Sequence, residues 1–310
     1  MDSKLKRISP DQYEILKQDI AAGHFGTVSK GKLLSTGEQI AIKVFKEPIT
    51  NSKDEQAFWK EVQFLDSINH PACLSLIGYD IQPEDQSHGP IIITPYMKCG
   101  TLADRIELCF SDDDYLLTPT QQTIIIYGIA RALAYLHQRN ILHRDLKPSN
   151  VFLNDNLEPI VSDFGLSRSW IPDSDFILTP SVGTPFYIAP EVSTGHYTEK
   201  VDVFSFGMLL PQIFTNEKHL DDENYVGAIK RENVNQRIES GSRPPQPAQM
   251  PDNIYEVATY CWKQDPNERL PFSVLCSCLE TEEYHVKGTD ENAFEKYKKK
   301  IDEAENQNKS

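Results

Sequence analysis

The chain has 310 residues, of which 39% are hydrophobic, and its formal net charge is −15; this suits one large bilobal domain or two small ones and disfavours nucleic acid and anionic membranes as partners. No apolar run approaches the roughly 18 residues of a membrane-spanning helix, and the polar N-terminus lacks the core of a signal peptide, so we expect a cytoplasmic protein. The six cysteines include no Cys-x-x-Cys pair, which argues against a zinc site or a disulfide framework.

The first third of the chain alternates short apolar runs with turn residues, a pattern that is typical of strands. The strands predicted in this way span residues 13–19, 28–33, 39–45, 74–79 and 91–96. Residues 53–68 differ, because Phe58, Val62 and Leu65 recur at helical spacing among charged residues. This spacing predicts one amphipathic helix among the strands.

Beyond residue 100 the apolar periods lengthen and predict helices at 120–138, 201–214, 254–263 and 272–280. Pro211 is expected to bend the second of these helices or to end it early. A strand-rich front and a helix-rich back indicate an α+β protein with two lobes. We expect an N-terminal extension at 1–12, a small lobe at 13–96, a large lobe at 97–283 and a charged tail at 284–310.

The C-terminal residues 284–310 are rich in Lys, Glu, Asp and Asn. A helix at 292–305 would carry a thin apolar stripe of Phe294, Tyr297 and Ile301. The composition favours a solvated tail, or the start of a downstream region. The alternative is a packed regulatory segment.

The most informative motif groups acidic, basic and amide side chains within a short span. It consists of His143-Arg144-Asp145-Leu146-Lys147-Pro148-Ser149-Asn150, followed by Asp163-Phe164-Gly165. It supplies a proton acceptor, a cation and two oxygen ligands for a divalent metal, and phosphoryl transfer needs little beyond such positioning and neutralisation of charge. The order resembles the catalytic and metal loops of protein kinases.

This resemblance implies a role for each residue of the motif. Asp145 would accept or orient the proton of the substrate hydroxyl, and Lys147 would neutralise charge on the transferring phosphoryl group. Asn150 and Asp163 would hold Mg²⁺ between the phosphates. His143, beside the catalytic Asp145, is expected to pack with Phe164 and to act neither as acid nor as base.

A glycine-containing segment lies between the first two predicted strands. By itself such a segment is more often only a turn, but it resembles the phosphate-binding loop of kinases, with Ala21 at the position of the first glycine. The extra methyl group puts the efficiency of nucleotide binding in doubt more than the capacity for it. The residues that the resemblance assigns to this part of the nucleotide site are Ile20, Ala21, Gly23, Gly26 and Val28.

Lys43 follows Ala41 and Ile42 in a predicted strand, and a lysine in such a place normally faces water. The resemblance to the kinase lysine strand implies instead that Lys43 touches the α and β phosphates and pairs with a helix glutamate. Glu61 is the expected partner, and Glu55 and Glu47 are weaker candidates.

The predicted connector between the lobes begins near Pro95, which has no N–H group. The resemblance therefore implies that Met97 donates a backbone hydrogen bond to adenine, with Thr94 at the back of the pocket. Val28 and Ala41 would cover the base from one side and Phe152 from the other. Simple core packing is the competing interpretation of these apolar residues.

The substrate class also follows from resemblance. Lys147 and the segment 183–191 resemble serine/threonine kinases, with Thr184 expected to bond toward Asp145 and Lys147. Glu191 is expected to pair with Arg269, and Asp202 to anchor the catalytic loop. Residues 261–269 resemble the tyrosine-kinase-like group, with Arg269-Leu270 in place of the usual Arg-Pro.

The resemblance covers about residues 13–282 and implies a protein serine/threonine kinase that uses ATP and Mg²⁺. The alternatives are a kinase fold without activity, for which Ala21 is the only hint, and a kinase of small molecules. Arg144 suggests regulation by upstream phosphorylation or autophosphorylation, because a phosphate on the activation segment can pair with such an arginine. The candidate sites are Ser167, Ser169, Ser174, Thr179 and Ser181.

Overall fold

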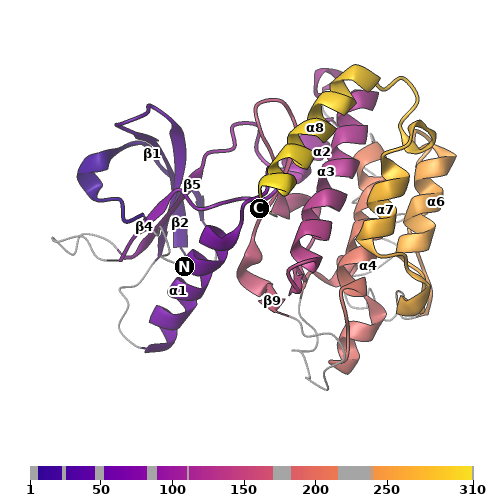
Figure 1. Cartoon of the computed structure of the whole chain (residues 1–310), viewed down its shortest axis with the longest axis horizontal. Coiled ribbons are helices and arrows are strands. Elements are labelled where there is room, and N and C mark those ends of the chain that lie inside the picture. The colour runs from indigo at the N-terminus through magenta and orange to yellow at the C-terminus, as the bar shows by residue number, and fades with distance from the viewer. Residues whose placement is uncertain are drawn as a thin grey trace. The chain divides into compact units, whose positions relative to one another are not determined.

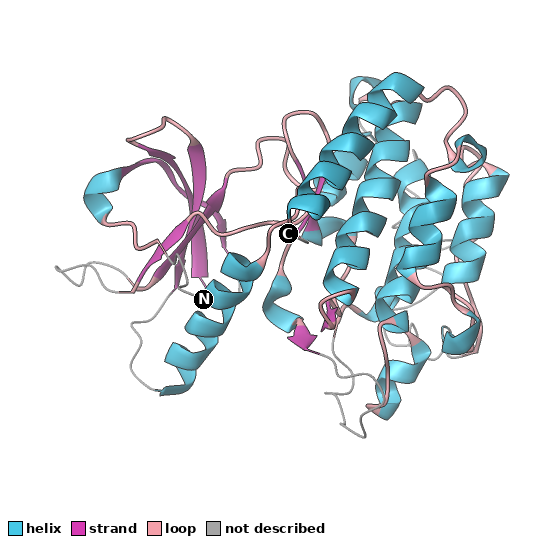
Figure 2. Cartoon of the chain, viewed as in Figure 1, coloured by secondary structure: helices cyan, strands magenta, loops and turns pink. Residues whose placement is uncertain are grey.

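The computed structural model describes residues 6–22, 26–45, 52–81, 89–109, 112–169, 183–215, 238 and 240–308, with only the backbone given at 22, 52–54, 57, 168 and 169. The chain divides into two compact units, Met1–Lys98 and Cys99–Ser310. Figure 2 shows that strands dominate the first unit and helices the second. The expected α+β class, with a β-rich and a helical lobe, is therefore confirmed.

The first unit is built on an antiparallel sheet with the strand order β1-β2-β3-β5-β4. The strands are β1 (Tyr13–Ala22), β2 (Gly26–Leu33), β3 (Gln39–Phe45), β4 (Gly78–Asp80) and β5 (Ile91–Pro95). Side chains alternate between the two faces of a strand. Ile40 and Ile42 of β3 lie opposite Pro95 and Ile93 of β5 and belong to the buried core of one face.

One helix, α1 (Ser52–Ser67), accompanies the sheet. It buries Phe58, Val62 and Leu65, as the amphipathic spacing predicts. The strand expected at 74–79 is shorter and begins only at Gly78. The preceding backbone bonds elsewhere, since the N–H of Leu76 donates to the carbonyl of Leu65 near the end of α1.

The residues before β1 are part of the first unit's core. Ile8 is 1% exposed and packs so tightly that a Cβ on Gly78 would lie 2.4 Å from its Cδ1. Arg7 pairs with Tyr79 in a parallel bridge, and its Nε lies 2.8 Å from Oδ1 of the buried Asp80. The described part of the N-terminal extension therefore supplies both an apolar side chain and a counter-ion to this unit.

The second unit is mainly helical. Its α-helices are α2 (Leu102–Cys109), α3 (Pro119–His137), α4 (Lys200–Leu209), α6 (Asp252–Cys261), α7 (Phe272–Leu279) and α8 (Glu291–Gln307). Two short two-stranded antiparallel sheets pair β6 (Ile141–Leu142) with β9 (Arg168–Ser169) and β7 (Val151–Leu153) with β8 (Pro159–Val161), and only β7 and β8 form a hairpin. Helix α3 packs against α7 and α8 (Figure 1).

Short 3₁₀ helices lie before and between these elements in the described residues. They are η1 (Pro10–Gln12), η2 (Asp113–Tyr115), η3 (Pro148–Asn150), η4 (Phe164–Leu166), η5 (Pro185–Tyr187), η6 (Pro190–Thr194), η7 (Leu210–Phe214), η10 (Pro266–Glu268) and η11 (Glu282–Tyr284). Helix α4 ends at Leu209 and continues as η7, so the expectation that Pro211 ends the α-helix early is confirmed. Among the described helices, none has the length and apolarity needed to span a membrane.

The C-terminal helix α8 corrects the expectation of a solvated tail. Phe294, Tyr297 and Ile301 are at most 3% exposed, and Asp290 caps the helix by accepting hydrogen bonds from the N–H groups of residues 292 and 293. The interpretation as a loose tail is wrong because its apolar stripe has a partner surface on α3, which lies far away in the sequence. The helix is therefore part of the second unit.

Candidate active site

The first unit holds Lys43 beside Glu61. The lysine comes from β3 and the glutamate from α1, and Nζ lies 2.6 Å from Oε1. Their side chains are 30% and 26% exposed, so solvent reaches both partners. The expected ion pair is confirmed. Of the weaker candidates, Glu55 is exposed, and Glu47 lies outside the described residues.

The sheet register places five of the predicted nucleotide-site residues on one face. Ala21 pairs with Val28, Val28 with Lys43, and Ala41 with Thr94. Directly paired residues share a face, as do residues two apart on a strand. This face is opposite to the one that carries the isoleucine core. Its side chains can therefore contact a ligand, whereas the core isoleucines are buried and cannot.

The remaining nucleotide-site candidates do not belong to this set of five and come from several parts of the chain. Ile20 lies on β1, and Met97 follows β5 and is half-buried. Phe152 belongs to the second unit, on β7, where it pairs with Ile160 and is also half-buried. Gly23 lies outside the described residues. A Cβ on Gly26 would lie 2.0 Å from the carbonyl oxygen of Val44, so tight strand pairing alone requires glycine there.

The second unit holds Asp145 in a closed set of hydrogen bonds. Oδ2 accepts from Nζ of Lys147 at 2.8 Å and from Nδ2 of Asn150 at 2.9 Å. Oδ1 accepts from the backbone N–H of Thr184 at 2.9 Å and from its hydroxyl at 2.8 Å. Lys147 also donates to that hydroxyl at 2.7 Å. The expected contacts of Thr184 with Asp145 and Lys147 are confirmed.

The backbone that carries Asp145 is fastened to Asp202 of α4. The N–H groups of His143 and Arg144 donate to the two oxygens of Asp202 at 2.9 and 2.8 Å. Arg144 is held at φ +71°, a left-handed conformation that costs roughly 1–2 kcal/mol for a residue with a side chain. These bonds stabilise the strained backbone, so the expected anchoring role of Asp202 is confirmed.

His137, at the end of α3, completes this anchor and was not foreseen from the sequence. Its Nε2 lies 2.8 Å from Oδ2 of Asp202. Burial by itself would raise the pKa of Asp202, but the hydrogen bond and charge of His137 and the nearby His143 outweigh it, so the pKa lies below its ordinary value. A histidine at the end of a largely apolar helix was the only available signal.

His143 packs as a structural residue. It is fully buried, its Nε2 lies 2.9 Å from the carbonyl oxygen of Ser162, and its ring meets Phe164 edge to face at 5.5 Å. A ring enclosed in this way has no open path to a substrate proton. The expected packing of His143 with Phe164 is confirmed.

The two candidate metal ligands, Asn150 and Asp163, lie at the same end of the β7–β8 hairpin. Asn150 directly precedes β7 and Asp163 follows β8, while Val151 and Val161 are paired and the N–H of Ser162 donates to the carbonyl of Asn150 at 2.9 Å. Asp163 is exposed in a left-handed conformation at φ +59°.

The donor set at this end suits a hard cation. Nδ2 of Asn150 donates to the carbonyl and to Oδ2 of Asp145, which turns its Oδ1 the other way. Carboxylate and amide oxygens are the ligands that Mg²⁺ takes in proteins. The residues present therefore fit the ion that the motif implies.

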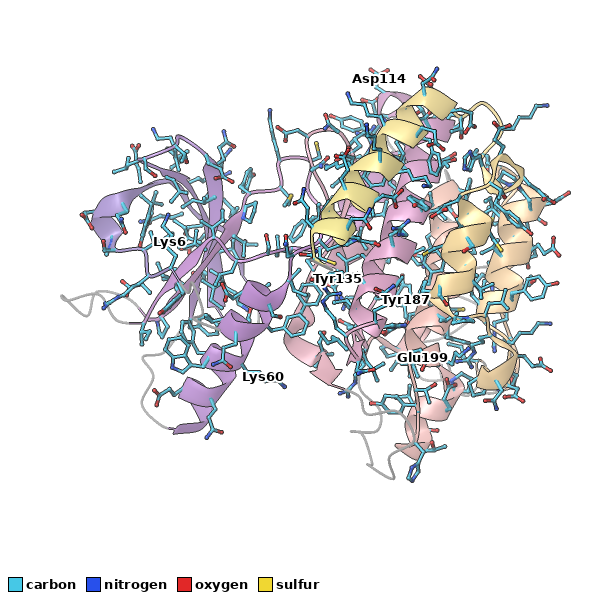
Figure 3. All side chains as sticks on the ribbon, viewed as in Figure 1. Lys6, Lys60, Asp114, Tyr135, Tyr187 and Glu199 are labelled. Carbon is cyan, nitrogen blue, oxygen red and sulfur yellow. The ribbon has the colours of Figure 1, made fainter. Side chains whose placement is uncertain are left out.

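The segment 183–191 packs against the catalytic loop, and it also bonds to Gln212 and Arg269. Gly183 has φ +119°, and a Cβ there would lie 2.8 Å from the carbonyl oxygen of Arg144. Tyr187, labelled in Figure 3, donates to Oε1 of Gln212 at 2.8 Å, and burial raises the pKa of its phenol. Glu191 receives a two-pronged bond from the buried Arg269, with Nη2 to Oε2 at 2.9 Å. The expected Glu191–Arg269 pair is confirmed.

The phosphorylation candidates fall mostly outside the described residues, as Ser174, Thr179 and Ser181 do. Ser167 is 3% exposed, and its hydroxyl donates to the carbonyl of His143 at 3.4 Å. This burial makes Ser167 a poor acceptor, because a modifying enzyme must reach the hydroxyl. For Ser169 only the backbone is described.

Comparison with known proteins places this geometry in a family. Residues 15–279 match the family model of protein tyrosine and serine/threonine kinases. The chain is 32% identical over 271 residues, 84% of its length, to the tyrosine-protein kinase receptor TYRO3 of Danio rerio. It is 34% identical over 224 residues (69%) to the receptor protein kinase WSS1 of Oryza sativa subsp. japonica, and 31% identical over 257 residues (83%) to the dual specificity protein kinase shkB of Dictyostelium discoideum.

These alignments span only 30%, 24% and 38% of the length of the three relatives, in the same order. Since the family model covers most of the chain and agrees with the loops and ion pairs described above, the chain belongs to the protein tyrosine and serine/threonine kinase family.

Proposed function

We propose that this chain is an active protein kinase that transfers the γ-phosphoryl group of ATP to serine and threonine hydroxyls of proteins. The observation that carries the proposal is the bonded set of Asp145, Lys147 and Thr184. The resemblance of Lys147 and the segment 183–191 to serine/threonine kinases implies an aliphatic hydroxyl as the acceptor, and the bonds between Lys147, Asp145 and Thr184 support this assignment.

In this function Asp145 orients the acceptor hydroxyl and takes up its proton as the new phosphate ester forms. Lys147 offsets negative charge on the transferring group. Asn150 and Asp163 would hold Mg²⁺, which when bound neutralises the phosphate oxygens. Lys43, kept in place by Glu61, would contact the α and β phosphates.

The nucleotide assignments rest on the face of the sheet that is opposite to its isoleucine core. Val28 and Ala41 would cover adenine, and the resemblance assigns Phe152 to its other side. Thr94 would lie at the back of the base, and the backbone of Met97 would donate a hydrogen bond to it. Ile20, Ala21, Gly23 and Gly26 would border the phosphates. The kinase family uses ATP and Mg²⁺ in general, and we extend both to this chain.

Serine/threonine specificity goes beyond the family match, which covers tyrosine kinases as well. The names of two relatives describe a tyrosine kinase and a dual specificity kinase. A cytoplasmic location, protein rather than nucleic-acid or membrane partners, and phosphorylation of the activation segment also stay predictions from the sequence.

The test is phosphotransfer from labelled ATP to a mixed basic peptide library, by wild type and by Asp145→Asn. We expect the variant to lose roughly 10²- to 10⁴-fold in kcat, the usual contribution of a positioned general base. Asp113→Asn is the charge-matched control, since Asp113 is exposed on η2. A kinase fold without activity predicts no transfer by wild type, and equal rates for wild type and Asp145→Asn would refute the role of Asp145.

A further inference from the structure

Helix α8 lies wholly beyond residues 15–279, which the family model matches, yet it is built into the second unit. It runs alongside α3 (Figure 1) and buries Phe294, Tyr297 and Ile301. The family fold alone does not account for this helix. Its contacts indicate what it does in this chain.

Arg131 of α3 clamps the C-terminal half of α8. Its guanidinium meets Glu305 at 2.8 Å and Asp302 at 2.9 Å, both on α8, and Glu280 at 2.9 Å just after α7. The arginine side chain is only 11% exposed. Charge-assisted bonds to a largely buried guanidinium are among the stronger polar contacts in proteins, so α8 is held in a defined position.

From this position α8 contacts the turn of the β7–β8 hairpin. Nζ of Lys300 lies 2.6 Å from Oε2 of Glu158, whose side chain is 14% exposed. The same oxygen accepts a bond from Nδ2 of Asn154 at 2.8 Å, across the turn. Leu157, within this turn, adopts φ +58°, a strained conformation for a residue with a side chain. The turn is also closed by its own bonds, since the N–H of Asn154 donates to the carbonyl of Glu158 at 3.1 Å, and Lys300 adds a contact from α8 to it.

A second contact joins α8, α3 and the start of β8. A Cβ on Gly128 of α3 would lie 2.3 Å from the hydroxyl of Tyr297 and 2.5 Å from Cγ of Pro159. Both side chains therefore press against the bare Cα of Gly128. Only glycine leaves this space, because any side chain at 128 must displace the helix or the hairpin.

The hairpin is short, so its turn lies close to its open end. Three residue pairs connect its turn to its open end, with Leu153 opposite Pro159 and Val151 opposite Val161. At roughly 3.3 Å per residue, the three steps from Leu153 at the turn to Asn150 at the open end span about 10 Å. The open end carries Asn150 and Asp163, and Ser162 bonds there to the carbonyl of Asn150 through both its N–H and its hydroxyl.

We propose that α8 positions the metal-binding end of this hairpin, with Lys300 and Tyr297 as positioning residues for Asn150 and Asp163. The assignment of these two residues to Mg²⁺ rests on the proposed function. The mechanical part, in which α8 restrains the hairpin, stands on the contacts alone. The helix would then be a support for the metal site that lies outside the residues matched by the family model.

The first experiment measures hydrogen–deuterium exchange of peptides covering residues 150–163 in the full chain without nucleotide. We expect Lys300→Glu, which repels Glu158, to speed exchange at the Ser162 amide by roughly two- to fivefold, the range of a partly exposed ion pair. The charge swap Lys300→Glu with Glu158→Lys should bring exchange back toward wild type.

Lys299→Glu is the matched control, because Lys299 is 77% exposed and pairs at 3.7 Å with Glu303 of the same helix. Gly128→Ala is the stronger perturbation, and it should speed exchange more than Lys300→Glu does. Equal exchange at Ser162 in wild type, Lys300→Glu and Gly128→Ala would overturn the proposal.

The second experiment titrates ADP binding with Mg²⁺ by calorimetry. Lys300→Glu should raise the half-saturating Mg²⁺ concentration about two- to fivefold with little change in Tm, and the charge swap should restore it. Faster exchange with an unchanged Mg²⁺ requirement would refute the link to the metal. A wild type that binds no ADP with Mg²⁺ would refute the proposed function, and the exchange data would then decide the role of α8 alone.

Discussion

The anchor of the catalytic loop and the Lys43–Glu61 pair are both charge interactions, but they differ in burial. The Asp202 carboxylate is fully buried and receives bonds from two backbone N–H groups and from His137. Glu61 and Lys43 are 26% and 30% exposed. A buried, multiply bonded carboxylate is part of the fold, whereas a solvated pair adds little to stability and can be broken without unfolding the protein.

The largest effect on stability is therefore expected at Asp202. In Asp202→Asn the amide oxygen can accept either the one hydrogen bond of Oδ1 or the two of Oδ2, and the NH₂ group then faces the remaining donor or donors. We expect the free energy of unfolding to fall by roughly 2–4 kcal/mol, since buried donors lose their acceptors. Urea unfolding followed by circular dichroism measures this. A loss well below 1 kcal/mol would show that the anchor contributes little to the fold.

The same difference in burial should appear in how the stability of the protein depends on pH. Because the pKa of Asp202 is lower in the folded chain than its ordinary value of 3.8, the stability that it contributes is complete above that value and is lost as the pH falls through the folded pKa. Below about pH 4 the free energy of unfolding of wild type should fall as the pH falls. This fall should be less steep in Asp202→Asn. Unfolding curves between pH 2 and 6 test this, and identical pH slopes for the two proteins would contradict it.

The smallest effect on stability is expected at Glu61. Glu61→Gln should change the free energy of unfolding by less than about 1 kcal/mol, because exposed ion pairs contribute little. It should nevertheless lower phosphotransfer at least tenfold if Lys43 must be held to contact phosphate. Glu55→Gln, at an exposed position of the same helix, is the control. A variant that loses stability in proportion to its activity would contradict the contrast with Asp202.

Local patterns predicted the elements and the motif chemistry well. The spacing of Phe58, Val62 and Leu65 identified α1, and Pro211 correctly ended α4, because both signals act within a few residues. The pairs Lys43–Glu61 and Glu191–Arg269 were predictable only because a family resemblance linked distant residues. Strands β6–β9 were missed because two or three residues are too few to show a period. Helix α2 was also missed, although it is as long as α7.

Contacts outside that resemblance could not be read from the sequence. The stripe of Phe294, Tyr297 and Ile301 was visible, but its partner surface around Arg131 lies more than 160 residues earlier. In the same way nothing near Arg7 indicated that it neutralises the buried Asp80. Such contacts depend on the tertiary fold, so the solvated tail was the wrong interpretation.

The most direct test of the account is the identity of the amino acid that receives phosphate. Peptides with serine, threonine or tyrosine at one otherwise constant position are incubated with labelled ATP, Mg²⁺ and the chain, and the labelled residue is determined after hydrolysis. The account predicts label on serine and threonine, and a labelling rate at least about 100-fold lower with Asp145→Asn. Label on tyrosine alone, or an undiminished labelling rate in Asp145→Asn, would contradict it.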